Sequence, residues 1–258
     1  MLMDSKARNE IIETGRRVWM RGLVAANDGN LSMRLGKDRI LITPTGVSKG
    51  FMNAADLVIC DLAGEVLSPH HRKVKPTTEL PMHLEIYRQR PDIHGVVHAH
   101  PPMATAFAAA GLSLKECLLA ETALLLGHVP LAPYATPSTQ EVPASIRPLV
   151  KRCDALLLAN HGAVTYGSSL KEAHFKMETL EHTAKVTYYA RALGTPTPLS
   201  SRELARLEDL KESTYGLKTR TLGPEAPPND PAAGTDGSSQ EELVRSVVES
   251  VVKRLLKR

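Results

Sequence analysis

A chain of 258 residues, with 42% hydrophobic and 23% charged side chains, is long enough to bury a sizeable core and has the composition of a globular protein. No apolar run reaches the roughly 18 residues of a membrane-spanning helix, and the first residues are too charged for a signal-peptide core. The net charge of +4 is too small and too scattered to predict nucleic-acid binding. Cys60, Cys117 and Cys153 are widely spaced, which argues against a disulfide framework and a thiolate zinc site. We therefore expect a cytoplasmic protein with neither a membrane nor a nucleic-acid partner.

The first part of the chain reads as one helix followed by short strands. Apolar residues recur at helical spacing over residues 5–25, which predicts an amphipathic helix, and a turn follows at residues 27–30. Apolar runs at residues 39–42 and 57–60 predict strands, with proline and glycine punctuating the segment between them.

The later part adds two further strands and two helices. The run at residues 95–100 predicts a strand that Pro101-Pro102 ends, and residues 154–159 predict a second apolar strand. Helical patterns follow at residues 169–193 and 201–212. This layout predicts an α/β fold.

Two histidine clusters stand at the ends of these later strands. Successive side chains alternate across a strand, so His98 and His100 project on the same side and can hold one ion. His161, at the end of the other strand, is the best candidate for a third ligand, and His128 is its main competitor. Three imidazoles with an open fourth position predict a catalytic Zn²⁺.

Other histidines have plainer interpretations. His174, Glu178 and His182 share one helical face and imitate a metal site, but the amphipathic pattern around them favours a surface or packing role. His70 and His71 lie beside a proline and are expected in an exposed loop.

Three short turns are rich in backbone donors and hydroxyl groups. They are Gly29-Asn30, residues 43–46 and Thr77-Thr78, the last beside Glu79. Such turns can cradle a phosphate, although each of them alone is also ordinary turn chemistry.

With these residues assembled, the chain resembles the class II aldolase and adducin family from about residue 5 to residue 220. The matching motifs are GNLS at 29–32, ITPTG at 42–46, PTTEL at 76–80, RPD at 90–92 with VVHAH at 96–100, APYAT at 132–136, NHG at 160–162 and TYGL at 214–217. This order of motifs is highly specific.

The resemblance implies a three-layer α/β/α sandwich around a mainly antiparallel sheet, in a catalytic domain of residues 1–222. It implies a homotetramer with active sites at subunit interfaces and zinc-dependent cleavage of a phosphorylated ketose such as fuculose 1-phosphate. It implies that His98, His100 and His161 would be the zinc ligands. Glu79 would be the acid/base group and can also be a fourth ligand, and Tyr215 would lie at the aldehyde end. The implied phosphate contacts are Asn27, Gly29, Asn30, Thr45, Gly46, Thr77 and Thr78.

Some positions depart from the family pattern. Members that act on fuculose phosphate have a tyrosine and a phenylalanine in the aldehyde pocket where this chain has Leu119 and Pro137. Asn27-Asp28 replaces a smaller pair, so Asp28 has to point away from a bound phosphate. These departures leave the identity of the sugar open.

Three alternatives remain within the resemblance. Ketose-phosphate 4-epimerases and dehydratases share the zinc and phosphate sites, and Glu121 would be an extra acid in a dehydratase or otherwise a helix-surface residue. A non-catalytic scaffold like the adducin head domain is the third. The retained histidines and Glu79 argue against it.

The last part of the chain has its own character. Residues 223–239 contain four prolines and three glycines, which predicts a flexible linker, and residues 240–258 place apolar pairs at four-residue intervals on an amphipathic helix. A linker with a terminal amphipathic helix resembles the encapsulation peptides of enzymes packed into bacterial microcompartments. It predicts such a location, with shell proteins as partners; a membrane-surface helix or an intersubunit coil are the alternatives.

Overall fold

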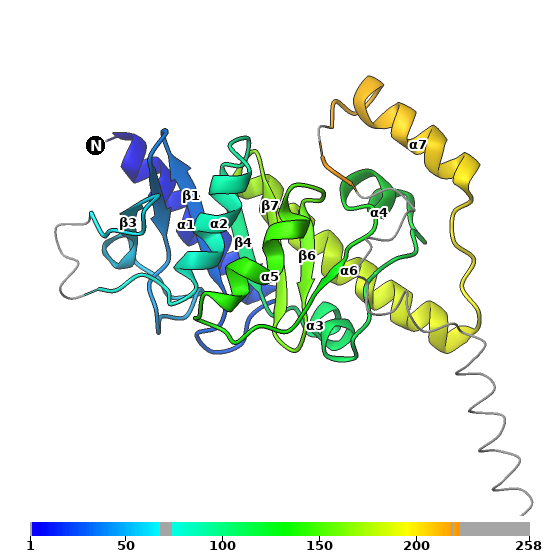
Figure 1. Ribbon diagram of the computed structural model, residues 1–258, viewed down its shortest axis with the longest axis horizontal. Coiled ribbons are helices and arrows are strands. Elements are labelled where there is room, and N and C mark those ends of the chain that lie inside the picture. The colour runs from blue at the N-terminus through cyan, green and yellow to red at the C-terminus, as the bar shows by residue number, and fades with distance from the viewer. Residues whose placement is uncertain (1, 68–73, 218, 222–258) are drawn as a thin grey trace, which may run out of the picture. The chain divides into compact units, whose positions relative to one another are not determined.

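The computed structural model describes residues 2–67, 74–217 and 219–221 (Figure 1). The predicted His70-His71 loop, the linker at residues 223–239 and the helix at residues 240–258 lie outside the described residues. No helix of the described part is both long enough and apolar enough to cross a bilayer.

The described residues form a seven-stranded sheet in the order β3-β2-β1-β4-β7-β6-β5. The strands are β1 (Asn30–Leu35), β2 (Arg39–Ile42), β3 (Val58–Asp61), β4 (Gly95–Ala99), β5 (Leu131–Ala132), β6 (Ala155–Leu158) and β7 (Gly162–Gly167). Neighbouring strands are antiparallel except β5 and β6, which are parallel. The mainly antiparallel sheet is confirmed.

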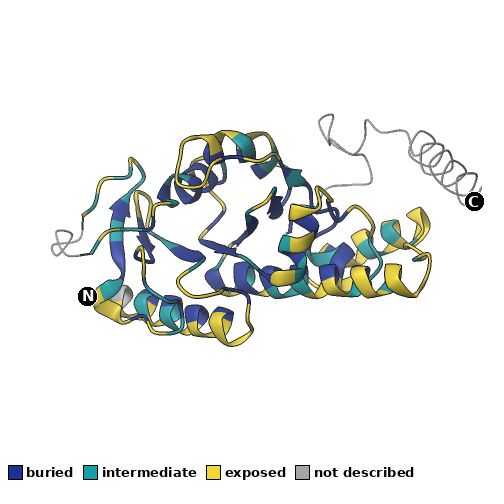
Figure 2. Cartoon of the chain, turned by 90° about the horizontal axis from the view of Figure 1, so that it is seen from below, coloured by how far each residue is buried: buried dark blue, intermediate teal, exposed yellow. Residues whose placement is uncertain are grey.

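Helices cover both faces of this sheet. They are α1 (Leu2–Met20), α2 (Leu80–Gln89), α3 (Pro102–Ala109), α4 (Ala120–Leu125), α5 (Glu141–Val150), α6 (Leu170–Leu193) and α7 (Ser201–Ser213), with a 3₁₀ turn η1 (Ala54–Asp56). In Figure 1, α2 and α5 lie in front of the sheet, and α1 and α6 lie behind it. Figure 2 shows buried strands between helices whose outer sides are exposed. The predicted α/β/α sandwich is therefore confirmed.

The strands β2, β4, β6 and β7 contribute residues to two hydrophobic cores, one on each face of the sheet. Val97 and Ala99 of β4 pack with α1, α3 and α6, whereas Val96 packs with α2 and α5. The same alternation holds for Leu41 and Ile40 of β2. Because both faces are covered, these strands read as continuous apolar runs instead of alternating ones.

The expected strands at residues 39–42, 57–60, 95–100 and 154–159 are present, each within about a residue at its ends. So are the helices, although the first ends at Met20 instead of residue 25. The sequence patterns did not predict β1, β5, β7 or the helices α2 to α5. Prolines explain part of this, since Pro102 opens α3 and Pro81 lies in the first turn of α2, positions where a missing N–H costs nothing.

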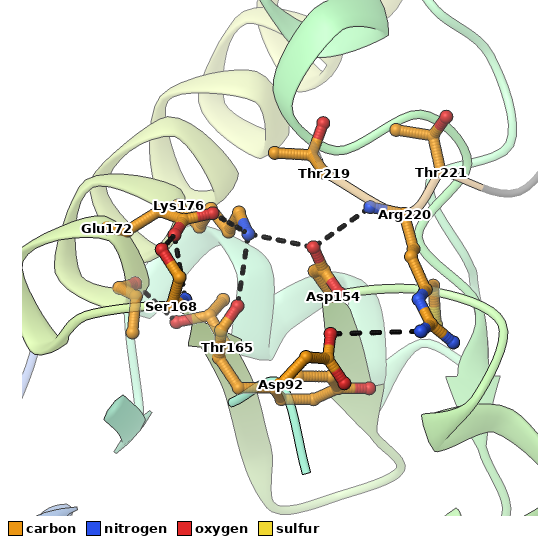
Figure 3. Close-up of polar contacts among 12 residues, drawn as sticks. Asp92, Asp154, Thr165, Ser168, Glu172, Lys176, Thr219, Arg220 and Thr221 are labelled. Atoms are coloured by element: carbon orange, nitrogen blue, oxygen red, sulfur yellow. Dashed lines mark hydrogen bonds and ion pairs between the residues drawn. The ribbon is translucent and has the colours of Figure 1, made fainter. Parts of the chain in front are cut away.

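A buried ion cluster holds the segment after α7 to the core (Figure 3). Lys176 Nζ lies 2.8 Å from Asp154 Oδ2 and 2.6 Å from Glu172 Oε1, and Arg90 Nη2 lies 2.9 Å from Asp154 Oδ1. The backbone N–H of Arg220 donates to Asp154 Oδ2 at 3.0 Å. Residues 219–221, which we call the C-terminal strap, are thereby fixed to Asp154, the residue before β6.

Candidate metal centre

Three histidines meet at the end of two neighbouring strands. His98 lies on β4, His100 follows it, and His161 directly precedes β7. The last pair of the β4–β7 ladder is Ala99 with Ala163, so the strand ends lie side by side. One ring nitrogen from each histidine lies within 4.8 Å of the other two. Among the described residues this is the group of histidines and acids that could hold a metal ion.

The corner that carries His161 depends on its neighbours. Asn160 has a φ of 53°, in the left-handed region that asparagine tolerates better than most residues. A Cβ atom at Gly162 would lie 2.6 Å from the Ala99 carbonyl oxygen and 2.6 Å from the His100 ring. Glycine is therefore needed for β7 to approach His100 this closely.

The orientation of His98 leaves a nitrogen for a metal. Its Nδ1 lies 2.9 Å from the Ala163 carbonyl oxygen, which can only accept, so Nδ1 carries the proton. Its Nε2 then faces His100 Nε2 at 3.1 Å and Glu79 Oε2 at 3.0 Å. Lone pairs at these distances repel each other unless a proton or a cation lies among them. The donor set and this convergence both fit a zinc ion.

Glu79 faces the same point from the start of α2. Its Oε1 atom is buried 3.2 Å from His161 Nε2 and has no partner with hydrogen-bond geometry. Burial alone would raise the pKa of Glu79, but the interactions with His98 and His161 together outweigh burial and hold the pKa far below its usual range. Conversely, burial would lower the pKa of His98, and the Glu79 carboxylate raises it. Glu79 is therefore ionised beside the three imidazoles.

His100 has the opposite tendency. Burial, with the neighbouring His98 and His161, lowers the pKa of His100 to about 4. The ring is neutral near pH 7, which is the form that binds a metal.

A buried chain of hydrogen bonds ends on Glu79. The amide of Asn30 donates to Glu79 Oε2 at 2.8 Å, so its Oδ1 accepts from His83 Nε2 at 2.6 Å. Burial lowers the pKa of His83 to about 3, so the ring is neutral and its Nδ1 accepts from Ser32 Oγ at 2.7 Å. Ser32 in turn accepts from Tyr87, whose hydroxyl lies 2.8 Å away. We call this directed series the Glu79 hydrogen-bond chain.

Sequence reasoning missed Ser32, His83 and Tyr87. His83 and Tyr87 are four residues apart on α2, and Asn30 and Ser32 are two apart on β1, so each pair shares one face. That spacing was a usable signal once α2 and β1 were recognised.

The predicted phosphate turns lie beside these residues. Asn30 pairs with His98 in the β1–β4 ladder, and a Cβ at Gly29, whose φ is 71°, would lie 2.8 Å from the His98 carbonyl oxygen. The backbone N–H of Thr77 donates to the Thr43 carbonyl, and Thr77 Oγ1 accepts from the Glu79 N–H at 3.3 Å.

The remaining predicted contacts belong to the same turns. Thr45 donates its N–H to the Lys75 carbonyl, Gly46 follows it with a φ of 72°, and Thr78 Oγ1 accepts from Ser138 next to Pro137. The Asn27 carbonyl accepts from Lys49. Phosphate binding by these residues stays a prediction.

Tyr215 does not meet the histidines of its own copy. It is 57% exposed and follows α7, which packs against α4. In Figure 1, α7 lies at the top, whereas α3, which begins two residues after His100, lies at the bottom. Within the described part of the chain, no contact joins Tyr215 to Glu79 or to the triad.

The other candidates lie elsewhere. His128 lines a pocket with Cys117 and Glu208, away from the triad. His174 is buried with its Nε2 3.8 Å from Glu178 Oε2, which supports the packing role expected for it.

Leu119 and Glu121 form another surface. They line a groove with Arg21, Glu178 and His182.

Comparison with known proteins adds a family. The model of the class II aldolase and adducin N-terminal domain matches residues 9–188. An L-fuculose phosphate aldolase of Methanococcus vannielii is 38% identical over 189 residues, 72% of this chain and 96% of that protein. A 3-oxo-tetronate 4-phosphate decarboxylase of Pectobacterium atrosepticum is 35% identical over 189 residues, 72% of this chain and 85% of that protein. A solved L-fuculose 1-phosphate aldolase superposes with a TM-score of 0.74 at 30% identity, covering 80% of this chain and 95% of that one.

Proposed function

This chain belongs to the class II aldolase and adducin family, and from that membership we propose that it cleaves L-fuculose 1-phosphate, or a similar ketose 1-phosphate, with zinc. The products would be dihydroxyacetone phosphate and L-lactaldehyde. The observation that carries the proposal is the convergence of three imidazoles and one ionised carboxylate on a single point.

His98, His100 and His161 would hold the zinc ion. When bound, the ion would supply stabilisation of the negative charge that carbon–carbon cleavage leaves on the carbonyl fragment. The His100 ring is neutral, and the hydrogen bond from His98 Nδ1 to the Ala163 carbonyl fixes the tautomer of His98. Both rings are therefore in the form that binds this ion.

Glu79 would move the proton. In the cleavage direction its carboxylate would accept the proton that the substrate hydroxyl group loses as it becomes the aldehyde, and would then deliver that proton to the phosphorylated three-carbon fragment; in condensation the two transfers would run in reverse. The amide of Asn30 fixes one carboxylate oxygen, and the Glu79 hydrogen-bond chain fixes Asn30. The carboxylate therefore keeps one orientation while its other oxygen, Oε1, stays without a hydrogen bond from the protein.

Tyr215 would act on the site of a neighbouring copy. It is exposed and makes no contact with its own triad within the described residues, and the family resemblance implies a fourfold tetramer with active sites between subunits. In such a tetramer, Tyr215 of one subunit would lie over the aldehyde end of the next.

A decarboxylase is the second candidate, because one relative that is 35% identical is named a 3-oxo-tetronate 4-phosphate decarboxylase. Loss of carbon dioxide and retro-aldol cleavage both leave a carbanion beside a carbonyl group, so the same triad and Glu79 could serve either reaction.

Product analysis of the zinc-loaded protein decides between them. Fuculose 1-phosphate, rhamnulose 1-phosphate and 3-oxo-tetronate 4-phosphate would be offered in turn, with dihydroxyacetone phosphate, aldehyde and carbon dioxide measured. We expect the first sugar to yield dihydroxyacetone phosphate and lactaldehyde. Carbon dioxide from the third substrate alone would replace the aldolase proposal by the decarboxylase. A rearranged sugar with its carbon skeleton intact would indicate an epimerase.

We further propose that residues 240–258 direct the enzyme into a bacterial microcompartment. The support is the linker composition and the apolar stripe of the sequence, together with the release of a reactive aldehyde by the proposed reaction.

A further inference from the structure

Lys49 is a buried lysine on the turn that follows residues 43–46. Only 1% of its surface is exposed. Its Nζ atom donates to the main-chain carbonyl oxygens of Asn27 at 2.8 Å and Val47 at 2.5 Å. One ammonium group therefore joins the segment that leads into the Gly29-Asn30 turn to the segment that follows residues 43–46.

The backbone of the Lys49 turn packs directly on α1. A Cβ atom at Gly15 of α1 would lie 2.8 Å from the Lys49 carbonyl oxygen, and one at Gly50 would lie 2.6 Å from the Trp19 ring. Trp19 and Phe51 meet edge to face, with their ring centroids 5.1 Å apart. This close packing holds the turn against α1 and keeps the ammonium group inside.

Burial of the Lys49 ammonium group is energetically unfavourable. A buried charge is normally paired with an opposite charge, because desolvation of an unpaired one is unfavourable. Among the described residues, the acceptors of Lys49 Nζ are the two carbonyl oxygens, and no carboxylate lies within ion-pair distance. Burial lowers the pKa of Lys49 to about 8, and Asp28 counteracts this. The group is thus mainly a cation near pH 7.

Asp28 makes a cation necessary if a phosphate binds here. It lies between Asn27 and Gly29, and its Oδ2 atom is 3.4 Å from His100 Nδ1. A phosphate dianion on Gly29 would be repelled by this carboxylate unless a positive charge offsets it. Lys49 is a buried cation, and the Asp28 carboxylate acts on it by raising its pKa against the effect of burial.

We propose that Lys49 binds the substrate phosphate electrostatically, as the cation held between the segments next to two phosphate turns, and that it offsets Asp28. The inference rests on the proposed function and deepens it by naming the charge that the turns otherwise lack. Lys49 needs no direct bond to the phosphate, because a positive charge acts over several ångströms in a site screened from water.

The test compares Lys49→Gln with Lys37→Gln in the full-length, zinc-loaded protein. Glutamine removes the charge and keeps an amide donor for the carbonyl groups, and Lys37 is an exposed residue on the β1–β2 turn. Calorimetry measures the dissociation constant of inorganic phosphate, and kinetics measure KM and kcat for the phosphorylated ketose. For Lys49→Gln we expect about tenfold weaker phosphate binding and a similar rise in KM, with kcat changed by less than about threefold. Lys37→Gln should match the wild type in both measurements.

The Asp28→Asn variant provides a second, independent test of the proposal. Combined with Lys49→Gln it should restore several-fold of the lost phosphate affinity, because the repelling carboxylate is gone. Alone it should tighten phosphate binding, which keeps the proposal testable if Lys49→Gln does not fold.

The outcomes separate this proposal from the one it rests on. Wild-type phosphate affinity in folded Lys49→Gln, or no effect of Asp28→Asn, overturns the role of Lys49 while the aldolase remains. A wild-type protein that neither binds phosphate nor cleaves a phosphorylated ketose overturns both.

Discussion

At the scale of single residues, the surroundings of Glu79 indicate its proposed role in proton transfer. It is ionised, one oxygen is fixed by Asn30, and the other is buried without a hydrogen bond. A buried polar atom without a partner is unfavourable unless a ligand supplies one. The free oxygen thus points to a proton or metal partner during the reaction.

Glu79→Gln should separate metal binding from proton transfer. Glutamine keeps the shape and the hydrogen bond with Asn30 but cannot carry the proton, so we expect kcat to fall at least about 100-fold. Zinc content, measured by elemental analysis, should stay at the wild-type level. The exposed Glu65→Gln is the matched control and should keep both.

His98→Ala completes the comparison, because it removes a ligand and should lose zinc and turnover together. A metal-free His98→Ala protein with wild-type activity contradicts the proposed chemistry.

The sequence was informative where chemistry and spacing coincide. His98 lies near the end of a visible apolar strand and His100 follows it, so their shared side was predictable, and their Nε2 atoms lie 3.1 Å apart in the structure. The role of Asn30 in holding Glu79 was not predictable, because it depends on a contact between residues 49 positions apart and on His83 from an unrecognised helix.

At the scale of elements, the C-terminal strap at residues 219–221 positions the short loop that carries Tyr215. Its backbone is held by Asp154, Thr219 Oγ1 donates to the Leu124 carbonyl, and Lys211 of α7 donates to Thr221 Oγ1. Tyr215 therefore lies on a short loop that is anchored on both sides, at α7 and at the strap.

Arg220→Pro should loosen this anchor. Proline removes the N–H that donates to Asp154, and a buried carboxylate that loses a donor costs about 1–3 kcal/mol of unfolding free energy. Arg220→Ala is the control, since it keeps the N–H and removes only the side chain. We expect a lower midpoint of thermal unfolding and a several-fold lower kcat for the proline variant alone. Equal stability of the two variants would show that the bond to Asp154 contributes nothing.

Elements whose sequence signals conflict were not predicted from the sequence. The pair Pro101-Pro102 ends β4 and opens α3 at the same point, so a strand-stop signal hid a helix start. By contrast, α6 has a serine cap at Ser169 that accepts from the Glu172 N–H, and its start was predicted.

At the scale of the whole molecule, the catalytic unit and the C-terminal segment are predicted to be independent. The residues of the site all precede residue 216, and the strap already anchors the chain at residues 219–221. Deletion of residues 223–258 should therefore leave kcat and KM within about twofold of the full chain. It should abolish co-purification with microcompartment shells. A truncated protein that has lost catalysis would assign the segment to the active site or to subunit assembly.

The Glu79 hydrogen-bond chain also has a direction. Tyr87, Ser32, His83 and Asn30 each donate one hydrogen bond toward the carboxylate, and the three groups between Tyr87 and Glu79 each accept one from the preceding group. Turning the Asn30 amide would require the other tautomer of His83 and a rotated Ser32 hydroxyl, so the four groups must switch together. The nitrogen NMR resonances of the buried His83 ring would therefore change in a single step when the protonation state of Glu79 changes. They can be recorded without altering the metal or the substrate.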